Sequence, residues 1–144
     1  MKYQKIDSKL FIKNRENFLS RMKPNSIAFF NSNDIYPVSA DSTLPFEQHR
    51  DIFYLSGVDQ EESVLMLCPS CSDQNLREVL FLKETDDHIA VWEGPKLNKK
   101  QAFETSGIKS VFWLDEMESI IDKVMNECET IYFNHNEHYR AKIE

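Results

Sequence analysis

Residues Ser110–Phe133 read SVFWLDEMESIIDKVMNECETIYF, and the spacing of their apolar side chains indicates the class of the fold. Short apolar runs at 110–114 and 131–133 are each long enough for a strand. Between them, apolar residues recur at helical spacing, at Met117, Ile120, Ile121, Val124, Met125 and Cys128. Asp115, with Glu118 three residues later, predicts the start of this helix. A strand, a helix and a strand in this order favour parallel pairing of the two strands and an α/β domain.

Further short apolar runs upstream of this stretch predict more strands. They lie at 27–30, 52–55, 64–68, 79–82 and 89–92, each bounded by turn-forming residues. The acidic segment 84–87 predicts the turn of an antiparallel hairpin between the last two runs, and the run before them would extend this hairpin to a meander. Segment 31–45 is rich in Ser, Asn, Asp and Pro and predicts a loop.

Two other segments predict helices that flank the sheet. Residues 8–22 carry an apolar stripe along one face of a helix. The stripe consists of Phe11, Arg15, Phe18 and Met22, with Leu10 and Leu19 beside them. Residues 99–106 would turn Ala102 and Phe103 inward, and Gly107 stands where a left-handed C-cap residue is expected. The whole pattern predicts an α/β domain with a mixed sheet flanked by helices.

The chain has 144 residues and a formal net charge of −7, from 17 basic and 24 acidic side chains. Its length suits one domain, so residues 1–144 are expected to form a single unit. The negative charge opposes binding to nucleic acids and anionic membranes. No apolar segment is long enough to span a bilayer, and residues 1–20 carry no apolar signal-peptide block, so we expect a cytoplasmic location. Three cysteines, an odd number, suit free thiols better than a disulfide framework.

Cys68 and Cys71 form a Cys-x-x-Cys pair, which can be a redox couple or half of a zinc site. For zinc, His135 and His138 would have to be the other two ligands. The pair follows a predicted strand and leads into a loop, whereas a reactive pair begins a helix. The sequence therefore favours a structural role, with Cys68 in the core and Cys71 in a turn, and leaves a thiol or zinc protein as an alternative.

Paired carboxylates could serve as a general acid and base. The pairs at 61–62, 86–87 and 115–116 occur at predicted turns or helix starts, where solvated acidic residues are common. The sequence contains no serine-hydrolase motif, no glycine-rich phosphate loop and no His-Glu-x-x-His motif. We therefore predict no catalytic residue and no metal ligand in this chain.

Trp92 is the candidate site residue. It is followed by Glu93, Gly94 and Pro95, and it ends a predicted strand. A large, rigid aromatic side chain in this place suits an interface anchor, although it could also complete the core.

Two segments together resemble a known family. The first is 44–58, LPFEQHRDIFYLSGV, followed by an apolar strand, and the second is 91–98, VWEGPKLN, followed by a helix that ends at Gly107. In order and spacing they are similar to the N-terminal domain of Xaa-Pro aminopeptidases, the creatinase/prolidase-like N-terminal domain of metallopeptidase family M24B. Asn98 stands where the family usually has Gly.

The resemblance implies a mixed six-stranded sheet with flanking helices and a non-catalytic role. In this family, two Asp, one His and two Glu of a C-terminal "pita-bread" domain hold two metal ions, usually manganese, and cleave the bond before proline. That catalytic domain is absent from residues 1–144, so we expect these residues to be a piece of a longer protein and inactive alone.

The resemblance also implies partners. The domain would contact its own C-terminal catalytic domain and neighbouring subunits of a homo-oligomer, and it would wall the groove for proline-containing peptides. Trp92 matches the family position that approaches a neighbouring active site, which requires an exposed side chain. Two alternatives stay open, namely a free-standing protein-binding or assembly module and the N-terminal domain of a prolidase or creatinase-like enzyme.

Overall fold

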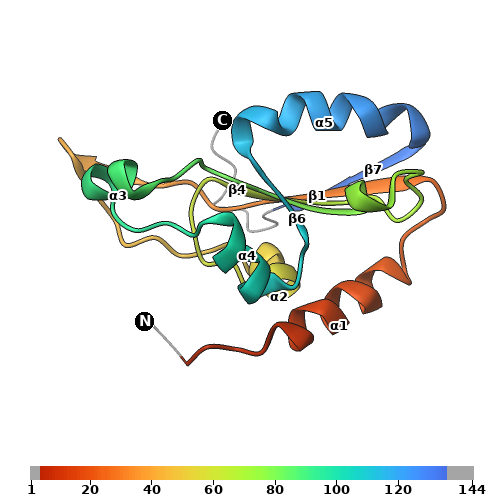
Figure 1. The fold of residues 1–144 in the computed structure, drawn as a ribbon, viewed down its shortest axis with the longest axis horizontal. Helices are drawn as coiled ribbons and strands as arrows, with labels where there is room; N and C mark the ends of the chain where they lie inside the picture. Colours follow the sequence, from red (N-terminus) through yellow and green to blue (C-terminus); the bar gives the residue numbers. More distant parts are fainter. Residues whose placement is uncertain (1–3, 136–144) are drawn as a thin grey trace.

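The computed structural model describes residues 4–135. A mixed sheet of five strands forms its centre, in the order β6-β5-β4-β1-β7 (Figure 1). These strands are β1 (Ser26–Asn31), β4 (Ser63–Leu67), β5 (Glu78–Leu82), β6 (Ser110–Trp113) and β7 (Thr130–Phe133). The helices are α1 (Ser8–Leu19), α2 (Arg50–Ser56), α3 (Asp87–Glu93), α4 (Lys99–Ser106) and α5 (Met117–Val124). β4 runs antiparallel to β1 and β5, whereas the edge strands β6 and β7 run parallel to β5 and β1.

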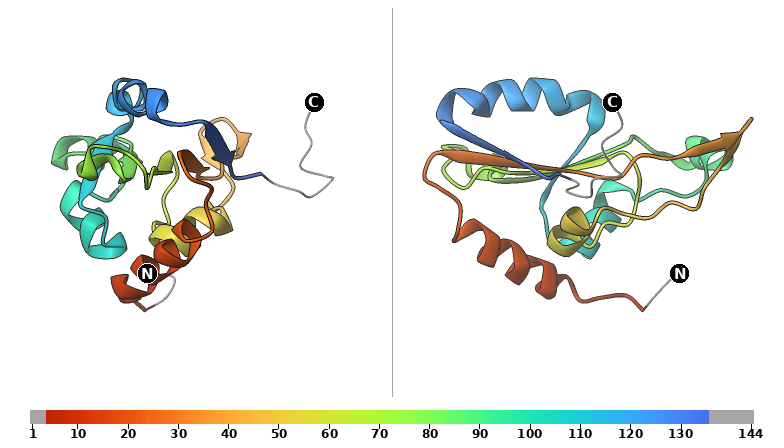
Figure 2. Two further views of the ribbon diagram at one scale, coloured as in Figure 1. Left: turned by 90° about the vertical axis from the view of Figure 1, so that its right-hand side faces the viewer. Right: turned by 180° about the vertical axis from the view of Figure 1, so that it is seen from behind.

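Helices cover both faces of the sheet. α5 lies on one face, and α1, α2 and α4 lie on the other (Figures 1 and 2). Side chains alternate along β1, so that Ala28 and Phe30 join the core formed with α2 and α4, while Ile27 and Phe29 join the core formed with α5. Burial on both faces explains why the central strands are continuous apolar runs in the sequence. Within residues 4–135, no helix has the length and apolar content needed to cross a bilayer.

The structure confirms the α/β class and the mixed sheet flanked by helices. Five of the predicted strands are present, as β1, β4, β5, β6 and β7, and the predicted loop contains a short hairpin of β2 (Pro37–Ser39) and β3 (Ser42–Thr43). Both strands around α5 belong to parallel pairs, but they lie at opposite edges of the sheet because α5 crosses it, so their direct pairing was a wrong prediction. α5 begins at Met117 after a 3₁₀ turn at Leu114–Glu116 rather than at Asp115.

The predicted apolar faces of the two flanking helices are each slightly too wide. Leu10 of α1 and Phe103 of α4 are 49% and 43% exposed, so neither belongs to the core. Phe11 and Ala102, their neighbours in sequence, are buried as predicted. Asn98, the residue that replaces the usual Gly, caps α4 by accepting a hydrogen bond from the Gln101 N–H at 2.9 Å.

The predicted strand at 52–55 is wrong, because these residues belong to α2. His49 begins this helix, and its Nδ1 accepts a hydrogen bond from the backbone N–H two residues later at 3.2 Å. Ile52 and Leu55 are buried whereas Tyr54 is 54% exposed, which is the pattern of a helix and not of a strand. A short apolar run carries too little periodicity to distinguish the two.

The predicted strand at 89–92 is also helical, as α3. Asp86, expected in a hairpin turn, is instead the N-cap, and its carboxylate accepts a hydrogen bond from the Ile89 N–H at 2.7 Å. No side chain of α3 is buried, so no core contact favours a strand here. The described sheet therefore has five strands and not the six that the resemblance implied.

α2 and α4 end in the same way. In each helix a serine, Ser56 or Ser106, donates its hydroxyl to the carbonyl oxygen four residues earlier, at 2.6 and 2.7 Å. The same hydroxyl accepts a hydrogen bond from the backbone N–H two residues later. Gly57 or Gly107 follows with a φ of 71° or 74°, in the left-handed region that ends helices.

α1 packs directly on these two caps. A Cβ atom added at Gly57 would overlap the ring of Phe11, and one at Gly107 would overlap the side chain of Ile12. Only glycine therefore fits at these positions, both for its positive φ and for the close approach of α1.

Arg15 of α1 lies at the junction of the three helices. Its side chain is 1% exposed, and its Nη1 donates to the carbonyl oxygens of Leu55 and Ser106 at 2.8 and 2.9 Å. Its Nε forms an ion pair with Glu78, the first residue of β5. The predicted apolar stripe placed Arg15 on the inward face, and the structure shows that its burial is satisfied by hydrogen bonds.

Gly57→Ala is expected to lower the free energy of unfolding by about 3 kcal/mol, because the new methyl group overlaps Phe11 while the backbone remains left-handed. The matched control is the same substitution in a Phe11→Ala background, where the ring that the new methyl group overlaps is absent. Relative to Phe11→Ala alone, Gly57→Ala should then cost only the strain of the left-handed backbone, about 1 kcal/mol. Urea unfolding followed by circular dichroism measures both values, and equal losses would contradict the close packing of α1.

Candidate functional site

The candidate site lies at the end of the sheet where β4 begins and β5 ends. Ser63 of β4 pairs with Leu82 of β5, and β1 and β6 finish at the same end, at Asn31 and Trp113. The chain leaves the strands here to build α3 and, after β1, the hairpin of β2 and β3 (Figure 1). We call this place the α3 end of the sheet.

Large apolar side chains are exposed on both of these elements. On α3, Val91 and Trp92 are 77% and 82% exposed, and we call them the α3 patch. Around the hairpin, the exposed apolar residues are Ile35, Tyr36, Val38 and Leu44. The two elements project from the same end of the molecule but on different sides of it (Figure 2). Trp92 therefore has the exposure that an interface anchor requires.

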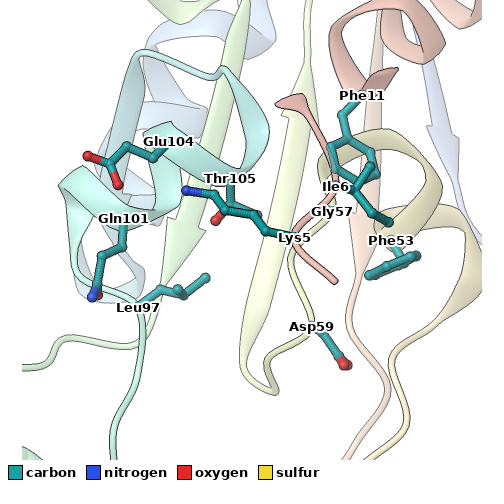
Figure 3. Close-up of a pocket in the computed structure, with 10 residues that line it drawn as sticks. All are labelled: Lys5, Ile6, Phe11, Phe53, Gly57, Asp59, Leu97, Gln101, Glu104 and Thr105. Carbon is teal, nitrogen blue, oxygen red and sulfur yellow. The ribbon is translucent and has the colours of Figure 1, made fainter. Parts of the chain in front are cut away.

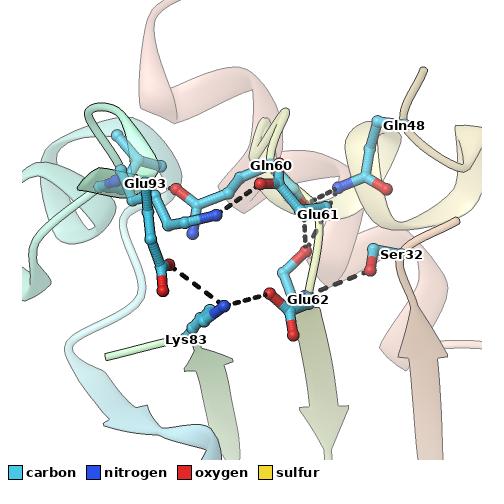
Figure 4. Close-up of polar contacts among 10 residues, drawn as sticks. Ser32, Gln48, Gln60, Glu61, Glu62, Lys83 and Glu93 are labelled. Carbon is cyan, nitrogen blue, oxygen red and sulfur yellow. Dashed lines mark hydrogen bonds and ion pairs between the residues drawn. The ribbon is translucent and has the colours of Figure 1, made fainter. Parts of the chain in front are cut away.

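Lys83 links α3 to the strands through two ion pairs. Its Nζ lies 3.1 Å from Glu62, just before β4, and 3.1 Å from Glu93, the last residue of α3 (Figure 4). Hydrogen bonds to these two carboxylates raise the pKa of Lys83 above its ordinary value. Each ion pair is partly exposed to solvent and contributes at most about 1 kcal/mol. Their effect is to orient α3 against the sheet end.

A second, more buried link holds the segment between α3 and α4. Lys96, with its side chain 7% exposed, forms an ion pair with Glu61, and the Leu97 N–H donates to Gln60 Oε1 at 2.8 Å. Burial acts to raise the pKa of Glu61, but the hydrogen bond and charge of Lys96 outweigh it, so the pKa lies below its ordinary value. Gln60 Nε2 is buried and has no hydrogen-bond partner among the described residues.

Gln48 positions the loop that carries these residues. Its Nε2 donates to the carbonyl oxygens of Val58 and Gln60 at 3.1 and 2.9 Å, and its Oε1 accepts from the His49 N–H at 2.8 Å (Figure 4). Ser63 Oγ donates to the same Gln60 carbonyl at 2.8 Å. Segment 44–58 therefore contains both the residue that holds this loop and the glycine on which α1 packs.

A groove of about 520 Å³ lies between the N-terminal segment, α2 and α4 (Figure 3). Phe11, Phe53 and Leu97 give it apolar walls, and Lys5 and Glu104 stand among its polar lining residues. Several of its lining residues come from the same three helices that Arg15 joins.

The structure places the Cys-x-x-Cys pair in the core. Cys68 and Cys71 are 0% and 1% exposed, and the Cys71 N–H donates to the Cys68 carbonyl at 3.1 Å, which closes the expected turn. The structure also brings Cys128 to this pair, with its Sγ 3.5 Å from Cys68 Sγ. Burial, followed by the neighbouring Cys128 thiol, raises the pKa of Cys68 to about 12. His135 is exposed, and the other proposed zinc ligand, His138, lies outside the described residues.

The acidic pairs have structural partners. Glu61 and Glu62 pair with lysines, Asp86 caps α3, and Glu116 accepts a hydrogen bond from the Trp113 N–H at 2.8 Å. Within residues 4–135, no three His, Cys, Asp or Glu side chains gather so that they could hold a metal ion.

The sequence singled out Trp92 as a candidate but not the residues that orient α3, on which Trp92 lies. Lys83 forms ion pairs, and Gln60 a hydrogen bond, with residues distant in sequence. No local spacing in the sequence predicts such contacts. Lys96 lies within the segment 91–98 that carries the family resemblance, so its place in that segment was the available signal.

Comparisons with known proteins agree with this architecture. The family model described as "Aminopeptidase P, N-terminal domain" matches residues 11–132. The Xaa-Pro aminopeptidase of Escherichia coli (strain K12) is 27% identical over 138 residues, which cover 96% of this chain and 31% of that protein. Intermediate cleaving peptidase 55 of Saccharomyces cerevisiae is 30% identical over 120 residues, which cover 78% of this chain and 22% of that protein.

Solved structures show the same fold. Aminopeptidase P from E. coli, in its low-pH form, aligns with a TM-score of 0.79 and 26% identity over 94% of this chain and 31% of that one. The Pseudomonas aeruginosa aminopeptidase PepP aligns with a TM-score of 0.83 and 23% identity over 94% of this chain and 30% of that one. The chain thus spans less than a third of the length of these relatives.

Lys96→Met is expected to raise the pKa of Glu61 relative to the unaltered protein, because the hydrogen bond and charge of Lys96 that lower it are lost while the burial that raises it remains. In the unaltered protein the lowered pKa stabilises the fold above pH 4.5, and this contribution is lost as the pH falls through the folded-state pKa. In the variant this stabilising contribution should be smaller. A pH titration of the Glu61 carboxyl by NMR measures the shift.

Lys99→Met is the control for this titration. Lys99 pairs with Glu116 at 3.5 Å, so its loss should leave the Glu61 titration unchanged. An unaltered Glu61 pKa in Lys96→Met would contradict the electrostatic role of this ion pair.

Proposed function

We infer that this chain has a docking role, and we start from its family. The chain belongs to the family of aminopeptidase P N-terminal domains. The proposal is that it forms the non-catalytic N-terminal domain of a longer, proline-specific metallopeptidase that releases the N-terminal residue from X-Pro peptides. The chain covers less than a third of the length of these relatives. This short span supports the proposal, because most of such an enzyme would lie outside these residues.

The observation that carries the proposal is the α3 patch. Trp92 is 82% exposed on a helix without a buried side chain, yet two ion pairs through Lys83 hold that helix in place. A rigid aromatic group presented in this way is typical of an interface anchor. We propose that Trp92 contacts the catalytic domain or a neighbouring subunit of a homo-oligomer and there walls the groove for proline-containing peptides.

The metal chemistry is proposed for another part of the longer protein. Two manganese ions would require a cluster of carboxylate and imidazole ligands. Residues 4–135 gather no such cluster, so they do not fit a dinuclear centre, and we derive no catalytic step for them. We also propose a cytoplasmic location, supported by three free cysteines, which suit a reducing compartment.

The coding sequence beyond residue 144 distinguishes this proposal from the alternatives. Continuation into a domain that supplies the metal ligands supports the peptidase. A reading frame that ends at Glu144 supports a free-standing binding module, for which the exposed Trp92 would be the contact residue.

The purified 144-residue chain is expected to hydrolyse no X-Pro peptide, with or without added manganese, because the described residues provide neither nucleophile activation nor a metal cluster. Release of the N-terminal residue from a peptide with proline in second position measures this. The E. coli relative, assayed in parallel, is the positive control. If the chain alone cleaved the peptide and a chelator abolished that activity, the proposal that catalysis belongs to another domain would be refuted.

In the longer protein, Trp92→Ala is expected to lower kcat/KM for X-Pro peptides by about tenfold or more, as loss of an interface anchor costs about 2 kcal/mol. The melting temperature of the domain should hardly change, because the side chain contributes little to its core. Leu10→Ala removes an exposed apolar side chain from α1 and serves as the control. Unchanged activity and unchanged oligomeric state in Trp92→Ala would contradict the docking role.

A further inference from the structure

The core on the α5 face contains two thiols in direct contact. Cys68 follows β4, and Cys128 follows the 3₁₀ turn Met125–Glu127 and precedes β7. Their sulfur atoms are 3.5 Å apart, which is direct contact and about 1.5 Å longer than a disulfide bond. Cys128 Sγ also lies 3.5 Å from the Val124 carbonyl oxygen, to which its thiol can donate.

The two thiols differ in their access to solvent. Cys68 is fully buried, whereas Cys128 is only partly buried. A small oxidant therefore reaches Cys128 first. Cys68 is then the resolving thiol, which attacks the oxidised Cys128. Cys71, the residue that the sequence pattern paired with Cys68, is 1% exposed and held in the turn that follows β4.

We propose that Cys68 and Cys128 are a modification site that forms a reversible intramolecular disulfide with a low-molecular-weight disulfide such as oxidised glutathione. The Cys128 thiolate attacks one sulfur of the oxidant, forming a mixed disulfide and releasing one glutathione thiolate. Cys68 then attacks Cys128 Sγ, and its proton leaves with the second glutathione, which is displaced as a thiol. The protein loses two hydrogen atoms, and the oxidant is reduced to two thiols.

The bond would tie together two layers of the fold. Cys68 belongs to the end of β4 and Cys128 to the segment between α5 and β7, and β1 lies between β4 and β7 in the sheet. The residues are 60 positions apart, so the crosslink would remove considerable freedom from the unfolded chain. This inference depends on the geometry of the core alone and not on the proposed docking role.

The test is oxidation of the purified chain with glutathione disulfide, followed by thiol counting, mass spectrometry and thermal unfolding. We expect two of the three thiols to be lost, a mass decrease of two hydrogen atoms without retained glutathione, and full reversal by dithiothreitol. The melting temperature should rise by about 5 °C or more in the oxidised form.

Cys71→Ser is the matched control, because it keeps the contacting pair and should oxidise as the unaltered chain does. Cys128→Ser removes the outer thiol and should form no intramolecular disulfide. The inference is overturned if Cys128→Ser still loses two hydrogen atoms, which would reveal a bond between Cys68 and Cys71. It is equally overturned if the unaltered chain retains glutathione without closing the bond, or if closure lowers the melting temperature.

Discussion

A single buried guanidinium, that of Arg15, fixes how the helices meet beneath the sheet. The side chain is 1% exposed, and its acceptors are the carbonyl oxygens of Leu55 and Ser106 and the carboxylate of Glu78. The two carbonyls end α2 and α4, where the helix dipoles concentrate negative charge. A buried cation deprived of such acceptors costs about 3 to 5 kcal/mol. The three helices can therefore pack only where both helix ends reach Arg15.

This constraint extends to the α3 end of the sheet. α2 ends at the Arg15 junction, and its cap directs the chain into the loop that carries Gln60 and Glu61. α4 ends at the same junction, so its other end places Leu97 and Lys96 beside that loop. The distance between the two helices is thus fixed at one end by the shared Arg15 cation and at the other by the partly buried ion pair of Lys96 and Glu61. α3 lies between β5 and α4 in the chain, so the positions of β5 and α4 determine where it lies.

The sequence was sufficient wherever a segment is long or buried on both faces. α1, α4 and the central strands follow from apolar spacing, and even the burial of Arg15 follows from its place in the stripe of α1. The strand predictions for 52–55 and 89–92 were wrong, because a run of four apolar residues fits a strand and a helix turn equally well. Their helical state depends on the caps at His49 and Asp86. The contacts of Lys83 and Cys128 join residues far apart in sequence, which no local pattern encodes.

The energetics of α3 indicate what the proposed partner would contribute to this helix. The helix has seven residues and no buried side chain, and a helix of that length is unstable by itself. The partly exposed ion pairs through Lys83 contribute at most about 1 kcal/mol each. Full burial of a Trp side chain, about 200 Å² at roughly 25 cal/mol per Å², would contribute up to about 5 kcal/mol. If Trp92 docks as proposed, its partner would contribute more to the stability of α3 than the two Lys83 ion pairs do, and order in this helix would then be coupled to occupancy of its surface.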